Sequence, residues 1–247
     1  MMAAPPKRIA MWSGPRNLST AMLYSFAARG DCAVWDEPFY AAYLQATGIA
    51  HPMAARIIAA NEADPARVAA ACTGPVPQGQ SLFYQKHMTL HMIPGFDRSF
   101  MKDCENVFLI RHPARVVASY ARKRENPTLA DIGFVQQAEL FDEVAQQLGR
   151  APLVIDSADI LANPQGALSA LCAALDLPFR AQMLHWPAGP KPFDGTWAPH
   201  WYNAVHQSTG FDGADGPLPR LPGAHAALAE AALPFYEKLA ENKLITV

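Results

Sequence analysis

Cysteine is scarce in this 247-residue chain, and its four cysteines are scattered. They are Cys32, Cys72, Cys104 and Cys172, with no Cys-x-x-Cys pair and no cluster of cysteine and histidine. A zinc site requires closely spaced ligands, and a disulfide framework is typical of short secreted chains that are much richer in cysteine. We therefore expect reduced thiols, no metal site and no disulfide framework.

Long apolar runs and an excess of basic charge are also missing. No segment holds about 18 consecutive apolar residues, so the sequence predicts no membrane-spanning helix. The net charge of −2 argues against a nucleic-acid-binding surface as the main function. The first eight residues are too short and too polar for a secretory signal. These absences favour a cytoplasmic protein that acts without a membrane or nucleic-acid partner.

No long glycine- and serine-rich linker and no internal repeat divides the chain. Hydrophobic residues make up 51% of it, which is enough for the core of a sizeable α/β domain. We therefore expect residues 1–247 to form one domain.

The start of the chain predicts a strand, a polar turn and a helix. An apolar run at 8–12 leads into Ser-Gly-Pro-Arg-Asn-Leu-Ser-Thr at 13–20 and then into a helical segment at 21–26. Such a junction leaves backbone N–H groups unpaired at the helix N-terminus, where the helix dipole favours an anion. Because Arg16, Ser19 and Thr20 stand beside these groups, we expect a phosphate-like ligand there. An ordinary capped helix is the alternative.

The common nucleotide-binding loop at such a junction, Gly-x-x-x-x-Gly-Lys-Ser/Thr, is absent. The spacing from Arg16 to the Ser-Thr pair resembles instead the 5′-phosphosulfate loop of the sulfotransferases. The resemblance implies that a loop made of Gly14, Pro15, Arg16, Asn17, Leu18, Ser19 and Thr20 binds the sulfuryl donor. Leu18 replaces the glycine of the family motif, so this loop must close without a residue that freely adopts a positive φ.

A second motif follows the apolar run at 106–110, which predicts a strand buried on both faces. Arg111 comes directly after this run, and Ser119 follows eight residues later. Ligands of open α/β sheets lie beyond the carboxyl ends of the strands, so Arg111 is placed to reach a bound nucleotide. The segment resembles the 3′-phosphate motif of the sulfotransferases, with His112 in place of the usual Asp or Asn. The resemblance implies that Arg111 and Ser119 bind the 3′-phosphate, and a solvated arginine-rich helix is the alternative.

A third segment, 81–94, supplies candidates for the chemistry. It predicts a strand that ends in Lys86 and His87, with Pro94 seven residues after the histidine. This interval resembles that of the cytosolic sulfotransferases and implies that His87 is the catalytic base, with Lys86 as a contact of the phosphosulfate. An imidazole pKa of about 6.5 suits proton transfer at neutral pH. A hydrogen-bonded structural histidine is the alternative for His87 and the interpretation we favour for His91.

Glu37 is the rival base. It follows a short predicted strand at 32–35, as does the glutamate of some carbohydrate sulfotransferases. Burial can raise the pKa of a carboxyl group far enough for this role. The longer spacing match ranks His87 above Glu37, and a surface turn before Pro38 is the structural alternative for Glu37.

The last third of the chain combines proline with aromatic residues, most densely at 186–202. Such a segment suits a long functional loop, and its aromatic residues predict a packed lid or an acceptor pocket. Lys191 loosely resembles a lysine of the loop that closes the donor site in the sulfotransferases, which implies a contact with the donor.

The resemblance as a whole implies a P-loop-like, three-layer α/β fold with a central parallel sheet of about five strands flanked by helices. It implies transfer of a sulfuryl group from 3′-phosphoadenosine 5′-phosphosulfate to a hydroxyl or amine of a small-molecule acceptor, without a metal. A P-loop kinase and a non-catalytic nucleotide-binding protein are the alternatives. The kinase would need a loop lysine and Mg²⁺ ligands, whereas the binding protein would keep Arg16, Arg111 and Ser119 but show no turnover.

Overall fold

A parallel sheet forms the centre of the computed structural model, which describes residues 5–122 and 126–246. Its strands are β1 (Lys7–Ser13), β2 (Cys32–Asp36), β3 (Leu82–Met88), β4 (Glu105–Ile110) and β5 (Leu153–Asp156). They lie in the order β2-β3-β1-β4-β5, and every pairing is parallel. The predicted α/β fold with a parallel sheet of about five strands is confirmed.

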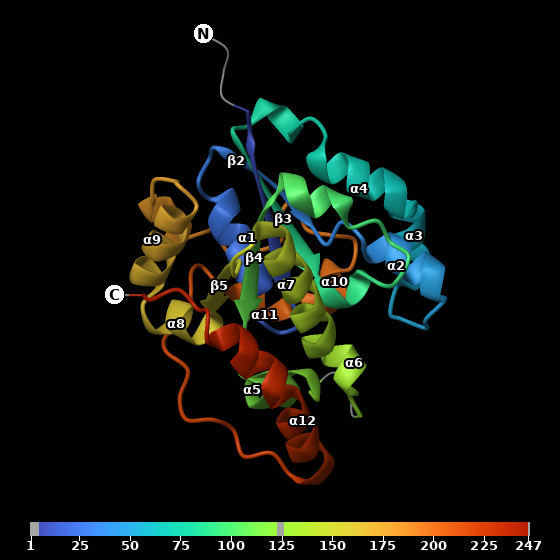
Figure 1. The fold of residues 1–247 in the computed structure, drawn as a ribbon, viewed down its shortest axis with the longest axis vertical. Coiled ribbons are helices and arrows are strands. Elements are labelled where there is room, and N and C mark those ends of the chain that lie inside the picture. Colours follow the sequence, from blue (N-terminus) through green and yellow to red (C-terminus); the bar gives the residue numbers. More distant parts are fainter. Residues whose placement is uncertain (1–4, 123–125, 247) are drawn as a thin grey trace.

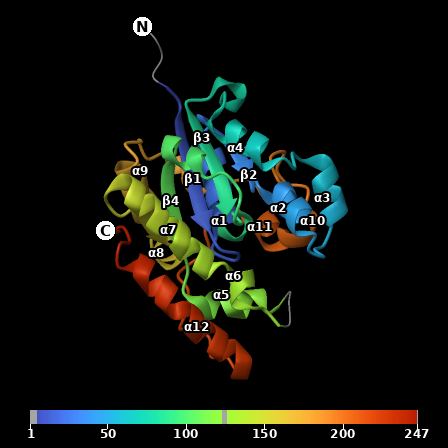
Figure 2. The same cartoon turned by 45° about the vertical axis from the view of Figure 1, so that its right-hand side comes forward.

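Helices cover both faces of this sheet (Figure 1). The helices are α1 (Ser19–Ala27), α2 (Tyr40–Thr47), α3 (Ala54–Ala60), α4 (Pro65–Thr73), α5 (Pro113–Tyr120), α6 (Leu129–Ile132), α7 (Phe134–Leu148), α8 (Ser157–Ala162), α9 (Pro164–Ala174), α10 (Ala198–Trp201), α11 (Asn203–Gln207) and α12 (Gly223–Ala240). Short 3₁₀ turns lie at Pro77–Gly79, Thr89–His91, Ser99–Asp103 and Ala181–Leu184. Figure 2 shows α7 crossing one face of the sheet, with α12 beside it.

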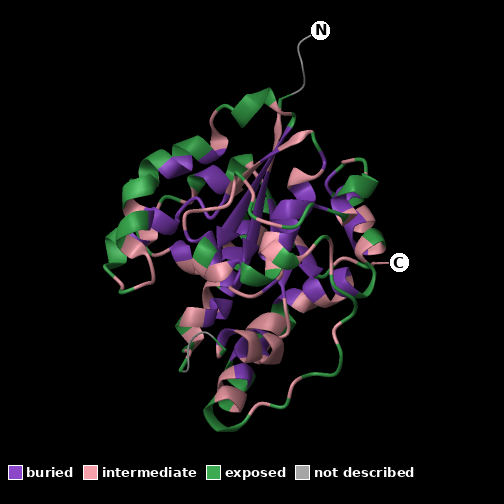
Figure 3. Cartoon of the chain, turned by 180° about the vertical axis from the view of Figure 1, so that it is seen from behind, coloured by how far each residue is buried: buried purple, intermediate pink, exposed green. Residues whose placement is uncertain are grey.

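The side chains of β1 alternate between two hydrophobic cores. Ile9 and Met11 pack with residues of α1 and α9, whereas Ala10 and Trp12 pack with residues of α4, α7 and the end of α12. Successive residues of a strand point to opposite faces, so a strand between two helical layers is apolar at every position. Figure 3 shows the sheet buried inside helices whose outer surfaces are exposed.

The parallel direction of the strands gathers polar residues at one edge of the sheet. The predicted site residues Gly14, Glu37 and Arg111 come directly after β1, β2 and β4, and Lys86 and His87 lie near the end of β3. The segment 208–222, orange in Figure 1, runs along the outside of the molecule to the start of α12. Within residues 5–122 and 126–246, no helix is both long and apolar enough to cross a membrane.

Candidate active site

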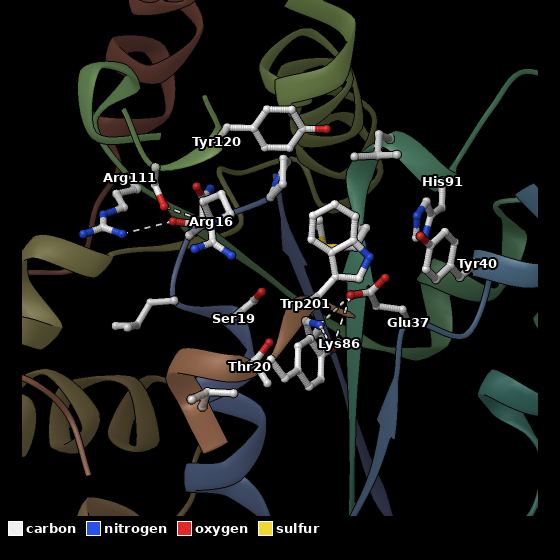
Figure 4. Close-up of a pocket in the computed structure, with 18 of the residues that line it drawn as sticks. Arg16, Ser19, Thr20, Glu37, Tyr40, Lys86, His91, Arg111, Tyr120 and Trp201 are labelled. Carbon is white, nitrogen blue, oxygen red and sulfur yellow. Dashed lines mark hydrogen bonds and ion pairs between the residues drawn. The ribbon is translucent and has the colours of Figure 1, made fainter. Parts of the chain in front are cut away.

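A cavity of about 560 Å³ lies at the carboxyl edge of the sheet. The predicted site residues that line it are Pro15, Arg16, Asn17, Leu18, Ser19, Thr20, Glu37, Lys86, Arg111 and Ser119. Figure 4 shows Arg16 and Arg111 on one side of the cavity, Glu37 and His91 on the other, and Lys86 between them. Three motifs that are far apart in the sequence therefore meet at one cavity.

The loop before α1 closes by placing two non-glycine residues in the left-handed region. Arg16 has φ 64° and Leu18 has φ 69°, and Leu18 is the N-cap of α1. The sequence analysis noted that Leu18 is not a residue that freely adopts a positive φ, and the structure places it in that conformation all the same. This backbone strain is of the kind found at ligand sites, at a cost of about 1–3 kcal/mol per residue. The N-cap makes no side-chain hydrogen bond, which leaves the first N–H groups of α1 available to an anion.

The arginines of the first two motifs lie together at one end of the cavity, where the sequence analysis expects the sulfuryl donor. Arg16 Nε donates a hydrogen bond to Ser119 Oγ over 2.9 Å, and Arg111 Nη1 donates to the carbonyl oxygen of Arg16 over 3.1 Å. Burial, and then the neighbouring charge of Arg111, lower the pKa of Arg16. Two close guanidinium groups repel one another, so an anion bound between them would relieve the repulsion.

The carboxylate of Asp215 forms an ion pair with Arg111 through the nitrogen Nη2. Arg111 Nη2 donates to both carboxylate oxygens of Asp215, over 3.1 and 3.0 Å, and Arg115 Nε lies 3.4 Å from the same carboxylate. Arg115 also donates to the carbonyl oxygen of Gly216. A carboxylate of segment 208–222 thus holds the arginine that the sequence assigns to a phosphate, and no sequence signal indicated this contact.

Glu37 belongs to a buried network of charges at the other end of the cavity. Lys86 Nζ donates to Glu37 Oε1 over 2.6 Å, to Asp36 Oδ1 over 2.9 Å and to Tyr202 Oη over 2.7 Å. Glu37 itself has φ 43°, and its side chain reaches the cavity from the turn after β2. An ammonium group has three donors, so Lys86 holds these three oxygens and has no donor left for a phosphosulfate. The structure thus commits Lys86 to holding Glu37, Asp36 and Tyr202, and its predicted contact with the sulfuryl donor stays a prediction.

The pKa values of this network follow from burial and from its charges. Burial raises the pKa of Glu37, and Lys86 opposes this shift only in part. For Lys86, burial disfavours the charged form, but the carboxylates of Asp36 and Glu37 prevail and raise the pKa of the ammonium group. A carboxylate with a raised pKa, held on a cavity wall, is suited to accept a proton near neutral pH.

His87 lies outside the cavity. Its ring stacks on Trp12 at 4.4 Å between centroids, and its Nε2 lies 3.1 Å from Gln85 Oε1. Burial lowers its pKa to about 3. Neighbouring residues of a strand point to opposite faces, so His87 enters the core behind the sheet when Lys86 faces the cavity. The structure therefore does not bring the predicted base His87 to the cavity, whereas its rival Glu37 lies on the cavity wall.

Lys191 and Gly14 also stand apart from the cavity. Lys191 Nζ donates to the carbonyl oxygens of Pro187 and Gly189, both over 2.6 Å, so the structure does not bring it to the predicted donor site. Gly14 packs so closely that a Cβ atom would lie 2.6 Å from the carbonyl oxygen of Ile132. The glycine is needed for this backbone contact, which fixes the loop against α6.

Rings line the cavity next to Glu37, and we call this set of five residues the ring wall. It consists of Tyr40, Tyr43, His51, His91 and Trp201. His91 stacks on Tyr40 at 4.6 Å and on Tyr43 at 5.0 Å, and His51 stacks on Trp201 at 5.6 Å. The sequence analysis predicted a packed lid or an acceptor pocket from the aromatic residues of 186–202, and Trp201 is the member of the ring wall that lies in this range.

Asp36 and Tyr202 are further residues of the site that the sequence analysis missed. Tyr202 Oη donates to Asp36 over 2.7 Å and accepts from Trp197 Nε1 over 3.0 Å. The N–H of Gly195 donates to Asp36 Oδ2 over 3.1 Å. Asp36 ends β2, so the rule that parallel strands present their carboxyl ends together could have found it. Through these bonds the aromatic segment is fastened over the buried charges.

These features define an α/β protein with an anion-binding helix start and a buried carboxylate at the carboxyl edge of one parallel sheet. The chain belongs to the sulfotransferase domain family, whose model matches residues 7–242. Membership supports sulfotransfer as the general reaction, and it confirms the resemblance inferred from the motifs.

Two curated relatives are from Arabidopsis thaliana. Branched-chain-amino-acid aminotransferase-like protein 1 is 36% identical over 96% of this chain and 42% of its own length. Branched-chain-amino-acid aminotransferase-like protein 2 is 35% identical over 92% of this chain and 40% of its own length. The chain thus spans about two fifths of these longer relatives.

Two solved structures share the fold. The sulfotransferase domain of the Synechococcus PCC 7002 olefin synthase is 17% identical and has a TM-score of 0.50, with 97% of each chain covered. The sulfotransferase domain from the curacin biosynthetic pathway is 16% identical and has a TM-score of 0.54, with 94% of this chain and 99% of that one covered.

Proposed function

We propose that this protein transfers a sulfuryl group from 3′-phosphoadenosine 5′-phosphosulfate to a hydroxyl or amine of a small molecule, with Glu37 as the base. The observation that carries the proposal is one cavity that joins an uncapped helix start and two arginines to a buried carboxylate with a raised pKa. The continuous sheet supports our further proposal that the chain forms one catalytic domain.

The donor end of the cavity fits a nucleotide that carries phosphate at both its 5′ and its 3′ position. The uncapped N–H groups of α1 with Arg16 suit the 5′ side, and Arg111 with Ser119 suits the 3′-phosphate. Two buried polar atoms there, Arg111 Nε and Asn17 Oδ1, have no hydrogen-bond partner among the described residues. Such orphaned atoms are rare in folded proteins, and a ligand or an ordered water would satisfy them.

Glu37 accounts for the proton balance of the reaction. The acceptor oxygen forms a bond to sulfur, the bond from sulfur to the phosphate oxygen breaks, and its electron pair leaves with the phosphate. The proton of the acceptor passes to the carboxylate of Glu37, whose position Lys86 fixes. Arg16 and the helix start stabilise the negative charge on the leaving phosphate.

The test compares Glu37→Gln with His87→Phe, the matched control in the core. Glu37→Gln should lower kcat by about 100-fold or more, because general-base catalysis contributes at least that much. Its affinity for adenosine 3′,5′-bisphosphate should stay near that of the wild type, because the base lies away from the donor end. His87→Phe keeps a flat ring against Trp12 and should retain kcat within a few-fold.

Radiolabelled sulfate transfer to a metabolite extract supplies the assay, and calorimetry supplies the affinity. A Glu37→Gln protein that keeps its turnover would refute the role of Glu37 as the base. Equal thermal stabilisation by ATP and by the bisphosphate would refute 3′-phosphoadenosine 5′-phosphosulfate as the donor. If the wild-type protein binds the bisphosphate strongly but transfers no sulfate, the alternative of a non-catalytic nucleotide-binding protein would be favoured.

A further inference from the structure

The ring wall begins directly beside the base. The N–H of Tyr40 donates to the carbonyl oxygen of Glu37 over 3.0 Å, so α2 carries Tyr40 into the cavity one turn after Glu37. His91 stacks on Tyr40 with only 14° between the ring planes. Figure 4 shows Tyr40 and His91 on the same side of the cavity as Glu37. A molecule that presents a hydroxyl to Glu37 therefore lies against these rings.

The rings are held in place by one another. Tyr40 Oη and His51 Nδ1 are 2.5 Å apart, and His51 stacks on Trp201 with 27° between the planes. Tyr43 also stacks on His91, with 28° between the ring planes. Tyr40 and His91 are buried, whereas the half-buried rings of Tyr43, His51 and Trp201 offer faces on which a flat ligand can stack.

His91 has a polar atom that the protein leaves unsatisfied. Its Nδ1 is buried and has no hydrogen-bond partner among the described residues, and the side chain is only 4% exposed. Burial keeps the ring neutral by lowering its pKa well below the usual value. A neutral imidazole can accept one hydrogen bond and donate one, and a buried polar group without a partner is costly. A hydroxyl of a bound molecule would form a hydrogen bond with Nδ1 after a small movement of the His91 side chain.

Two carboxylates, Asp36 and Glu37, share one cation where the ring wall meets the base. Lys86 is the cation that contacts Glu37, and its three donors are committed to Asp36, Glu37 and Tyr202. A carboxylate on the acceptor would lose its hydration beside Glu37 and find no free cation in the ring wall. An uncharged acceptor avoids this cost.

We propose that the ring wall binds an uncharged acceptor built on a flat ring, with its reacting hydroxyl at Glu37 and a second hydroxyl hydrogen-bonded to His91. The proposal deepens the proposed function and rests on it for the reaction, but not for the binding.

Three probes with one carbon frame test the binding by calorimetry, with and without adenosine 3′,5′-bisphosphate. They are naphthalene-2,6-diol, 2-naphthol and 6-hydroxy-2-naphthoate. The diol should bind about 5-fold more tightly than 2-naphthol, which is the effect of one added hydrogen bond. The carboxylate should bind at least about 10-fold more weakly than the diol, because its charge is desolvated without a partner.

His91→Phe keeps the stacked ring and removes both nitrogens, and His87→Phe is the matched control. His91→Phe should erase the advantage of the diol and leave the affinity for 2-naphthol within about 2-fold. His87→Phe should change neither affinity. With the sulfuryl donor, His91→Phe should raise KM for the diol about 5-fold at nearly constant kcat, which a second base would not do.

Four results would overturn the proposal: no binding of any probe, equal binding of the diol and 2-naphthol, tightest binding of the carboxylate, or an equal loss for both alcohols in His91→Phe. The titrations do not depend on sulfate transfer. Normal selectivity for the diol without turnover would therefore reject the proposed reaction and retain the binding site.

Discussion

Asp215→Asn should strengthen the binding of adenosine 3′,5′-bisphosphate while it weakens the ligand-free protein. In the structure both carboxylate oxygens of Asp215 accept hydrogen bonds from Nη2 of Arg111, the residue that we propose for the 3′-phosphate. Bisphosphate and Asp215 therefore compete for one guanidinium group. Asparagine has nearly the same shape but no charge, so it competes less.

The size of the effect follows from the burial of the pair. A hydrogen bond between charged groups contributes about 1.5–3 kcal/mol. The side chains of Arg111 and Asp215 are 18% and 20% exposed, so solvent weakens the contact, and we expect about 1 kcal/mol. This energy corresponds to about 5-fold in Kd and, with the opposite sign, to a fall of about 2–4 °C in the Tm of the ligand-free protein.

Calorimetric titration and thermal scanning measure the two effects on the same samples. Asp142→Asn is the matched control, because Asp142 pairs with Lys238 on the surface over 2.6 Å. The control should leave the bisphosphate affinity unchanged. Weaker bisphosphate binding by Asp215→Asn would refute the competition and show that Asp215 orients Arg111 for the phosphate.

Two further substitutions test the buried charges and the strained loop. Lys86→Met should lower the free energy of unfolding at pH 7 by about 3–5 kcal/mol, because it leaves Asp36 and Glu37 buried without their cation. The folded-state pKa of Glu37 is raised, so protonation of Glu37 relieves this penalty as the pH falls. The loss in free energy of unfolding relative to the wild type, measured in urea, should therefore shrink from pH 7 to pH 5. A loss that stays constant over this range would contradict the role of Lys86 as the cation of Glu37. Leu18→Ile places a β-branched residue at φ 69° and should lower the Tm by about 2–4 °C, and an unchanged Tm in thermal scanning would show that the loop bears no strain there.

The sheet could be predicted because burial on both faces marks its strands in the sequence. β1 is apolar from Ile9 to Trp12 and β4 from Val107 to Ile110, and polar residues follow each run directly. The carboxyl ends of parallel strands share one edge, so the same pattern also predicted that Arg16 and Arg111 would meet.

Spacing alone could not show which candidate for the base faces the cavity. Lys86 and His87 are adjacent, and a strand sends adjacent side chains to opposite faces. The interval from His87 to Pro94 carries no information on which face meets the cavity. That depends on the register of β3 beside β1, where Trp12 pairs with His87 and takes its ring into the core.

Contacts made by irregular segments also could not be predicted from the sequence. Asp215 meets Arg111 across 104 positions of sequence, from a segment with no regular pattern. His91 reaches the cavity because the 3₁₀ turn Thr89–His91 folds the chain back after β3. Neither a period of 2 nor one of 3.6 describes such placements.

The bonds of Asp36 have a consequence for how this site can change during evolution. Asp36 accepts hydrogen bonds from Lys86, from Tyr202 and from the backbone of Gly195, and Lys86 in turn holds Glu37. Replacement of Asp36, Lys86 or Tyr202 alone leaves a buried charge or hydroxyl without its partner. Each single replacement therefore destabilises the protein, which hinders a stepwise change of the residue at the proposed base. We expect Asp36, Lys86 and Tyr202 to be inherited or replaced together among relatives that keep Glu37, so the three residues would mark the members of the family that share the proposed base.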